Sequence, residues 1–151
     1  AMGDIYINAK NYDKAKQVLN IAITVNPNYS KGHANLGIIY VEEKDWEAAV
    51  TSLQMAVALN EQDAMSFFRL ASAQNSTGNC EEAKIAARNS TELKNRFGGA
   101  WYELGIAEWC SGRGNKTASL NAFEKARGDR TWRTMAEYEI DKVKNPQKYE
   151  N

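Results

Sequence analysis

The stretch that decides the fold is residues 30–63, which read SKGHANLGIIYVEEKDWEAAVTSLQMAVALNEQD. Its first half carries small and apolar residues at helical spacing, namely His33, Leu36, Gly37 and Tyr40. Lys44-Asp45 then interrupts the pattern, and Asp45 is of a residue type that caps a following helix. A second helical stripe follows, formed by Ala49, Leu53, Ala56 and Val57. The stretch therefore predicts two helices joined by a tight turn, with Ser30 as the expected cap of the first.

The same pattern recurs every 34 residues along the chain. Two series of equivalent positions show this period, Gly3, Gly37, Ala71 and Gly105 in one and Ala15, Ala49 and Ala83 in the other. A fixed period of this length indicates one structural unit copied along the chain, and such units stack into an open solenoid. The small residues predict a close approach of the two helices in each unit, because a glycine within a helix otherwise costs about 1 kcal/mol relative to alanine.

These positions resemble the pattern of the tetratricopeptide repeat family, which places Trp, Leu, Gly and Tyr on the first helix of a unit and Ala, Phe, Ala and Pro after it. The unit at 30–63 supplies His33, Leu36, Gly37, Tyr40, Ala49, Leu53 and Ala56. The fourth unit begins with Trp101, Leu104 and Gly105 but has Glu108 in place of Tyr. The resemblance covers about residues 1 to 128 and implies an all-α fold, a right-handed α-solenoid of antiparallel helix pairs.

The period also predicts how the chain is divided. The expected segments are a partial first unit at 1–29, units at 30–63 and 64–97, a fourth unit at 98–128 with two extra loop residues within 111–115, a capping helix at 129–144 and a disordered tail at 145–151. Trp132, Met135 and Ala136 are expected to pack the capping helix on the fourth unit. Because the chain begins inside a first helix, we expect a longer parent protein.

Charge and hydropathy exclude two classes of partner. The chain has 19 Lys and Arg against 19 Asp and Glu, so it lacks the basic excess that attracts nucleic-acid phosphates. No stretch approaches the ~18 apolar residues of a membrane-spanning helix. No signal peptide is visible, which favours a cytoplasmic location, with a periplasmic or secreted one if an N-terminal signal has been removed.

Residues that often carry chemistry occur here without the arrangements that chemistry needs. His33, the single histidine, occupies the slot where the family places Trp, which favours a packing role. Cys80 and Cys110 have no CxxC spacing, so we expect reduced packing residues; a disulfide would require alpha carbons within about 7 Å. One histidine and two cysteines are too few to hold zinc. The sequence predicts no enzyme, no cofactor and no metal site.

The resemblance also implies a binding surface. In tetratricopeptide repeat proteins, one stripe of each first helix lines a concave groove that binds extended or helical peptides. Carried over by position, that stripe consists of Lys31, Ala34, Asn35, Ile38, Val41, Met65, Phe68, Arg69, Ser72, Tyr102, Glu103, Ile106 and Trp109. Apolar patches of this kind usually mark interaction sites. The alternative is that Tyr102 and Trp109 pack against the final helix and that Phe68 fills space between neighbouring first helices.

One variant of the family can be compared position by position. Members that bind chaperones clamp the C-terminal carboxylate of a peptide with Lys, Asn and Arg side chains. Asn35 and Arg69 match that set, whereas Asp4 and Met65 do not. Because a carboxylate needs paired cationic donors, we expect a chaperone C-terminal peptide to bind weakly or not at all.

Three hypotheses for function remain. The first is a non-catalytic protein–protein interaction module, a scaffold or assembly factor that binds an apolar peptide or helix of a partner protein in the groove. The second is a self-association module, in which Ile5 and Tyr6 at an exposed repeat end pair with another copy to form a homodimer. The third is a targeting domain of a larger enzyme or of a secretion or assembly protein. The sequence does not identify the partner.

Overall fold

The computed structural model describes residues 2–110 and 115–149. In this part of the chain the elements are α1 (Met2–Asn8), α2 (Tyr12–Val25), α3 (Ser30–Glu42), α4 (Trp46–Leu59), α5 (Ala64–Ser76), α6 (Cys80–Leu93), α7 (Gly98–Cys110), α8 (Lys116–Arg127), α9 (Arg133–Lys144) and the 3₁₀ helix η2 (Pro146–Lys148). Most of the predicted loop insertion, residues 111–114, lies outside the described residues. None of the described helices is both long and apolar enough to span a membrane.

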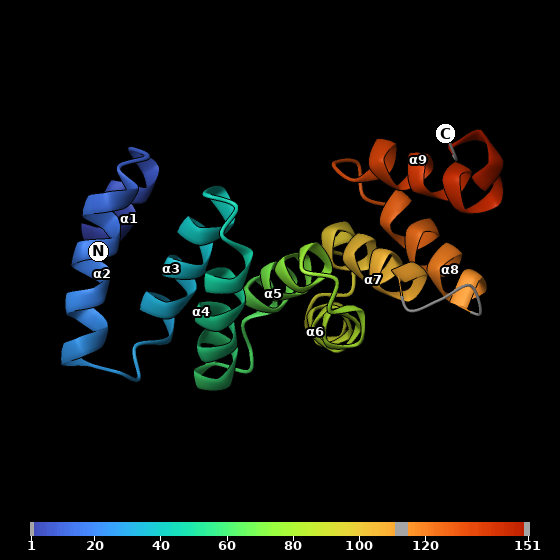
Figure 1. Ribbon diagram of the computed structural model, residues 1–151. Coiled ribbons are helices and arrows are strands. Elements are labelled where there is room, and N and C mark those ends of the chain that lie inside the picture. Colours follow the sequence, from blue (N-terminus) through green and yellow to red (C-terminus); the bar gives the residue numbers. More distant parts are fainter. Residues whose placement is uncertain (1, 111–114, 150–151) are drawn as a thin grey trace.

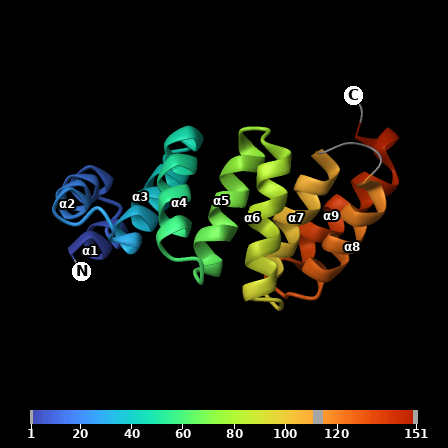
Figure 2. The ribbon, with the colours of Figure 1, turned by 90° about the horizontal axis from the view of Figure 1, so that it is seen from below.

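Consecutive helices pack in pairs, and the pairs follow one another along the array. The most extensive packing joins α3 to α4, α5 to α6 and α7 to α8, while α9 packs on α8 (Figure 1). The first helices of successive pairs also contact each other, α1 with α3, α3 with α5 and α5 with α7. Figure 2 shows the pairs arranged side by side from α1 to α9. The predicted all-α helical repeat solenoid is confirmed.

The small residues of the repeat lie where the paired helices come closest. A Cβ added at Gly37 would lie 2.5 Å from Cγ of Leu53, and one at Gly105 would lie 2.5 Å from Cε1 of Phe123. Leu53 and Phe123 are fully buried. The predicted close approach is confirmed, because any side chain at these glycines would displace the large residue that fills each unit.

Of the two helix caps predicted for the unit at 30–63, one is confirmed and one is wrong. Asp45 accepts a hydrogen bond at Oδ1 from the backbone N–H of Ala48, so it caps α4 as expected. The expectation for Ser30 is wrong. It is the first residue of α3 rather than its cap, and Tyr29 before it offers no side-chain cap bond.

Helix α9 closes the C-terminal end of the array with different residues from those predicted. Ala136 is buried and Trp132 contacts ring side chains of earlier units, as expected. Met135 instead remains exposed, and Ile140 and Val143 are buried in its place. The helix begins at Arg133, and the buried positions follow the stripe that its register presents to α8.

Residues 145–149 are ordered, contrary to the expected disordered tail. Pro146–Lys148 forms the short helix η2, and the Tyr149 hydroxyl donates a 2.6 Å hydrogen bond to Oδ2 of Asp141. The rings of Tyr138 and Tyr149 meet edge to face with centroids 5.4 Å apart. These contacts hold the segment against α9 and were not recognisable before the helix register was known.

Candidate functional site

The predicted groove residues all lie on the first helices α3, α5 and α7, and we call them the stripe surface. Lys31 is exposed, whereas Ala34, Asn35 and Glu103 are buried. The others are half-buried, namely Ile38, Val41, Met65, Phe68, Arg69, Ser72, Tyr102, Ile106 and Trp109. In Figure 1, α5 lies between α4 and α7, and α7 lies between α6 and α9. Three seams between neighbouring first helices divide the stripe surface.

The seam between α1 and α3 is closed by a charged cluster. Oδ2 of Asp4 accepts a 3.0 Å hydrogen bond from Nζ of Lys31, and its Oδ1 accepts one of 2.7 Å from Nδ2 of Asn35. The Lys31 bond, with help from that of Asn35, lowers the pKa of Asp4 to about 2. Asn35 is therefore engaged within the protein, where a carboxylate clamp would need it free.

The seam between α5 and α7 is closed by a buried acid. Nδ2 of Asn75 donates to the backbone oxygen of Glu103 at 3.0 Å and to its carboxylate Oε2 at 2.8 Å. Burial raises the pKa of Glu103, while hydrogen bonds from Asn75 and Ser72 act in the opposite direction. The Asn75 amide and the Glu103 carboxylate thus bind each other, and Glu103 joins α7 to α5.

The seam between α3 and α5 differs from its two neighbours. Arg69 is equivalent, by the period of 34 residues, to Asn35 and Glu103 in the other two seams. By the same period, Ile38 is equivalent to Asp4 and Ser72. Within the described residues, the Arg69 guanidinium forms no hydrogen bond or ion pair. Burial lowers its pKa, and the charge of Asp63 raises it. At this seam the repeat therefore has a half-buried cation and an apolar residue in the positions where its neighbours have hydrogen-bonded polar groups.

The C-terminal part of the stripe surface is covered by the chain's own cap. Trp132 brings its ring to 5.8 Å from Phe68 and 5.2 Å from Tyr102, centroid to centroid. A Cβ at Gly99 would lie 2.9 Å from the Trp132 indole, so the absence of a side chain at Gly99 makes room for this ring. Burial, the largest cause, raises the pKa of Tyr102 to about 12.

Helix α9 covers the next turns of α7. Ile106 and Trp109 pack against the buried cluster of Phe123, Ile140 and Val143. Tyr102 and Trp109 thus pack against the cluster that includes residues of the final helix. This is the alternative to a binding role that was raised for them from the sequence. The open part of the stripe surface therefore lies on α3 and α5.

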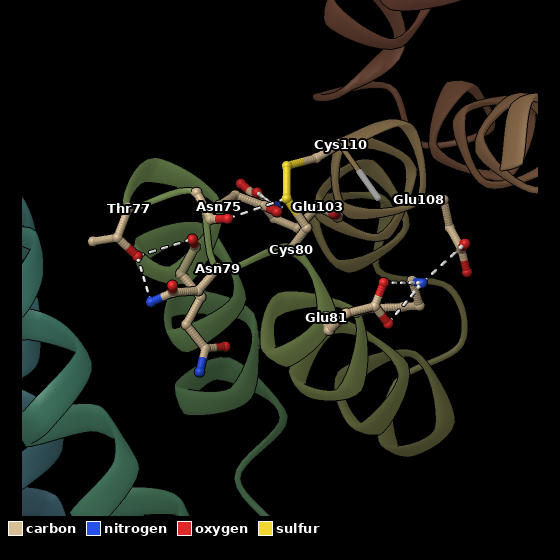
Figure 3. The surroundings of a disulfide bond; sticks show 11 residues. Asn75, Thr77, Asn79, Cys80, Glu81, Glu103, Glu108 and Cys110 are labelled. Atoms are coloured by element: carbon tan, nitrogen blue, oxygen red, sulfur yellow. Dashed lines mark hydrogen bonds and ion pairs between the residues drawn. A yellow bond between two sulfur atoms is a disulfide. The ribbon is translucent and has the colours of Figure 1, made fainter. Parts of the chain in front are cut away.

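The expectation of reduced cysteines is wrong. Cys80 and Cys110 form a disulfide with alpha carbons 5.7 Å apart, and no free cysteine is found among the described residues. Cys80 begins α6 and Cys110 ends α7, so the antiparallel packing of these helices brings the two together (Figure 3). A separation of 30 residues in sequence conceals this proximity, which depends on the tertiary arrangement.

A buried ion-pair network lies on the same junction and was not predicted. Glu108, only 4% exposed, accepts a 2.7 Å hydrogen bond from Arg88 and lies 3.7 Å from Nζ of Lys84. Nζ of Lys84 also lies 3.0 Å from Oε1 of Glu81. Figure 3 shows Glu81 and Glu108 near the disulfide. The only sequence signal was the departure from Tyr at position 108. The described residues contain no group of three or more His, Cys, Asp or Glu that could hold a metal ion.

Comparison with known proteins agrees with this geometry. A sequence model of the tetratricopeptide repeat family matches residues 1–29. No curated protein matches the chain. Among solved structures, MamA is similar with a TM-score of 0.87 and 21% identity over 97% of this chain and 85% of that one. YrrB, a tetratricopeptide repeat protein with an unusual peptide-binding site, is similar with a TM-score of 0.79 and 24% identity over 90% and 69%.

A third structure contains a ligand. The first tetratricopeptide repeat domain of Spaghetti (RPAP3), bound to the HSP90 peptide SRMEEVD, is similar with a TM-score of 0.68 and 24% identity over 74% of this chain and 89% of that one. At these identities the likeness concerns the fold. Together with the sequence match over residues 1–29, it supports the resemblance to tetratricopeptide repeat proteins that the repeat pattern indicated.

Proposed function

We propose that this protein is a non-catalytic interaction module that binds an apolar peptide or helix of a partner protein along α3 and α5. The observation that carries the proposal is the seam of Arg69, a half-buried cation without a partner in the described part of the chain. Ile38 and Met65 are half-buried apolar residues of the same stripe surface. Structural relatives that bind peptides support the general role.

Arg69 also indicates what the peptide carries. A guanidinium removed from water is best satisfied by a carboxylate, which it can bind with two parallel hydrogen bonds. An apolar peptide with one acidic side chain would place its carboxylate on Arg69 and its apolar residues on Ile38 and Met65. Lys31 is exposed at the rim, where it can contribute to orientation although it is paired with Asp4.

The test is a selection of displayed peptides on the intact protein, followed by affinity measurements on variants. Selected peptides should combine apolar residues with an acidic one, and Arg69→Gln should weaken them about tenfold, because a charge-assisted pair at a partly buried site is lost. The matched control is Arg130→Gln, at an exposed position in the α8–α9 connection. Equal affinity of both variants, or selected peptides without acids, would contradict the assignment.

The substitutions for such tests should avoid the covered end of the stripe surface. Replacing Phe68, Tyr102 and Trp109 would disturb the packing under Trp132 and α9, and a loss of binding would then be ambiguous. Ile38→Ser and Met65→Ser are the sharper pair. The peptide SRMEEVD serves as a negative probe, because Asn35 is engaged by Asp4 and that carboxylate repels another.

Self-association is a second candidate, favoured by one residue. Ile5 is 66% exposed, whereas the equivalent Ile39, Ala73 and Ala107 are fully buried against the preceding pair. A second copy could cover this face of α1. Sedimentation over a concentration series should then show a dimer that Ile5→Asn abolishes, and a monomer at all concentrations would refute it.

A further inference from the structure

A groove on the outer side of the array lies away from the stripe surface. Two cavities of about 510 and 180 Å³ lie between α4, α5 and α6 and share Phe67 and Asn89 in their linings. The two cavities therefore adjoin each other, and we treat them together as one channel, which α4 and α6 flank and α5 floors. Figure 2 shows α5 between these two helices. Along α6 the channel extends from Glu82 to Leu93, about 16 Å at roughly 1.5 Å per residue.

The floor and one wall of this outer groove are apolar. Phe67 and Leu70 form the floor, and Val57 closes the side of α4. On α6, Ile85 is 63% exposed and Leu93 is also exposed, although both are large apolar side chains. Such contiguous exposure next to a concave floor is typical of a surface that another molecule covers.

The rim of the outer groove is acidic. Glu61, Glu82 and Glu92 line it, whereas no Lys, Arg or His does so among its described lining residues. None of the three carboxylates forms an ion pair within the described chain. The cations of α6 nearest to it, Lys84 and Arg88, are both directed to Glu108 on α7. In a chain with equal numbers of positive and negative residues, this asymmetry selects a basic ligand.

A buried acceptor lies at the floor. Gln74 is one of the residues that line the smaller cavity, and its Oε1 is buried without a hydrogen-bond partner among the described residues. Gln74 as a whole is 4% exposed. Buried polar atoms are nearly always satisfied, so an unused acceptor beside an open channel favours a ligand that brings a donor.

The next repeat gives an internal comparison. An equivalent cavity of about 530 Å³ has Asn95, Arg96 and Trp101 where the outer groove has Glu61, Gln62 and Phe67. Lys125 also lines that cavity, where its Nζ lies 3.9 Å from the Trp101 ring centroid and places a positive charge on the apolar ring. The repeat therefore forms a hollow at both places, but only the one between α4 and α6 combines an acidic rim with open apolar residues.

We propose that the outer groove binds a basic amphipathic helix of a partner protein. Its apolar face would lie on Phe67, Ile85 and Leu93, and its Lys or Arg side chains would pair with Glu82 and Glu92. Two flanking helices and a helical floor suit the helix-in-groove mode, in which apolar residues recur three or four positions apart. This site goes beyond the peptide site on α3 and α5, and the two can be occupied independently.

The test uses two labelled model peptides on the intact protein. One is an amphipathic helix of leucine and lysine, and the other has glutamate in place of lysine. The first should bind and shift amide resonances of α4 and α6, and its affinity should fall with added salt. Glu82→Gln/Glu92→Gln should weaken it about tenfold, since each exposed charge pair contributes a small share. Ile85→Ser should weaken binding at unchanged charge.

The matched control is Glu42→Gln/Glu137→Gln, which removes two exposed carboxylates elsewhere. It should change the affinity less than twofold if the rim charges act locally. Equal loss in both double variants, equal binding of the two peptides, or resonance shifts confined to α3 and α5 would each overturn the proposal. Arg69→Gln should leave this binding intact, which separates it from the proposed function.

Discussion

The junction between the third and fourth units and the junction between the second and third are built on the same repeat but differ in how they are closed. At the first, the Cys80–Cys110 disulfide, the Glu108 network and the Asn75–Glu103 pair all join neighbouring units. At the second, Arg69 and Gln74 stand in the positions of Glu103 and Glu108, and the Arg69 guanidinium and the Gln74 Oε1 lack partners in the described chain. One junction is cross-linked by its own bonds, although Asn75 Oδ1 there is also buried without a partner among the described residues, whereas the other junction lacks such cross-links.

This difference teaches where a repeat protein of this kind keeps surface for others. Polar groups that are satisfied within the chain hold neighbouring units at one angle and offer nothing to a ligand. Groups left unsatisfied cost stability and are retained where a partner compensates for them. Both proposed sites accordingly use α5, the helix with the unpartnered groups.

The largest expected effect comes from opening the fixed junction. Cys80→Ser/Cys110→Ser should lower the free energy of unfolding by about 3 kcal/mol, because the cross-link closes a loop of 30 residues. Urea unfolding of the variant, compared with the oxidised and the reduced wild-type protein, measures this. Reduced wild type should match the variant. An unchanged midpoint would show that the junction does not depend on the disulfide.

A smaller loss is expected from the ion-pair network beside it. Glu108→Gln should cost about 1 to 2 kcal/mol, because it removes a buried charge that Arg88 and Lys84 both contact. Glu137→Gln on the exposed face of α9 is the control and should change stability within about 0.5 kcal/mol. Thermal or urea unfolding distinguishes them, and equal effects would mean that the network adds nothing to the junction.

The smallest expected effect is an opposite pH dependence of two seams. The pKa of Asp4 is lowered to about 2, so its stabilising contribution is complete above the usual value near 3.8 and is lost as the pH falls toward 2. The pKa of Glu103 is raised, so its contribution is complete below its usual value of 4.5 and is lost as the pH rises through the raised value.

The free energy of unfolding, measured from pH 2 to 7, tests these opposite pH dependences. The wild-type protein should lose stability as the pH falls toward 2, and Asp4→Asn should reduce this loss. The reduction should be less than about 1 kcal/mol, because the ion pair is partly exposed. Glu103→Gln should instead remove a loss of stability on the alkaline side of pH 4.5. Identical pH profiles for the two variants would contradict the distinction between the seams.

Much of the fold was predictable because its signals are local or periodic. The spacing of Gly37 and Leu53 within one unit gave the close approach of paired helices, and Asp45 gave a helix start. Candidate site residues were harder to judge. Position alone placed Arg69 and Tyr102 on one stripe, but only packing revealed that Arg69 lacks a partner while Tyr102 lies beneath Trp132.

By itself, the sequence determined the repeated helix pair and the all-α helical repeat fold, because both rest on spacings shorter than one unit or equal to it. The tertiary structure alone decided which equivalent positions are satisfied. The disulfide, the Glu108 network, the cap over α7 and the outer groove all depend on contacts between units or with α9. Such contacts are set by the packing angle of neighbouring helices, which depends on many side chains at once and leaves no periodic trace in the chain.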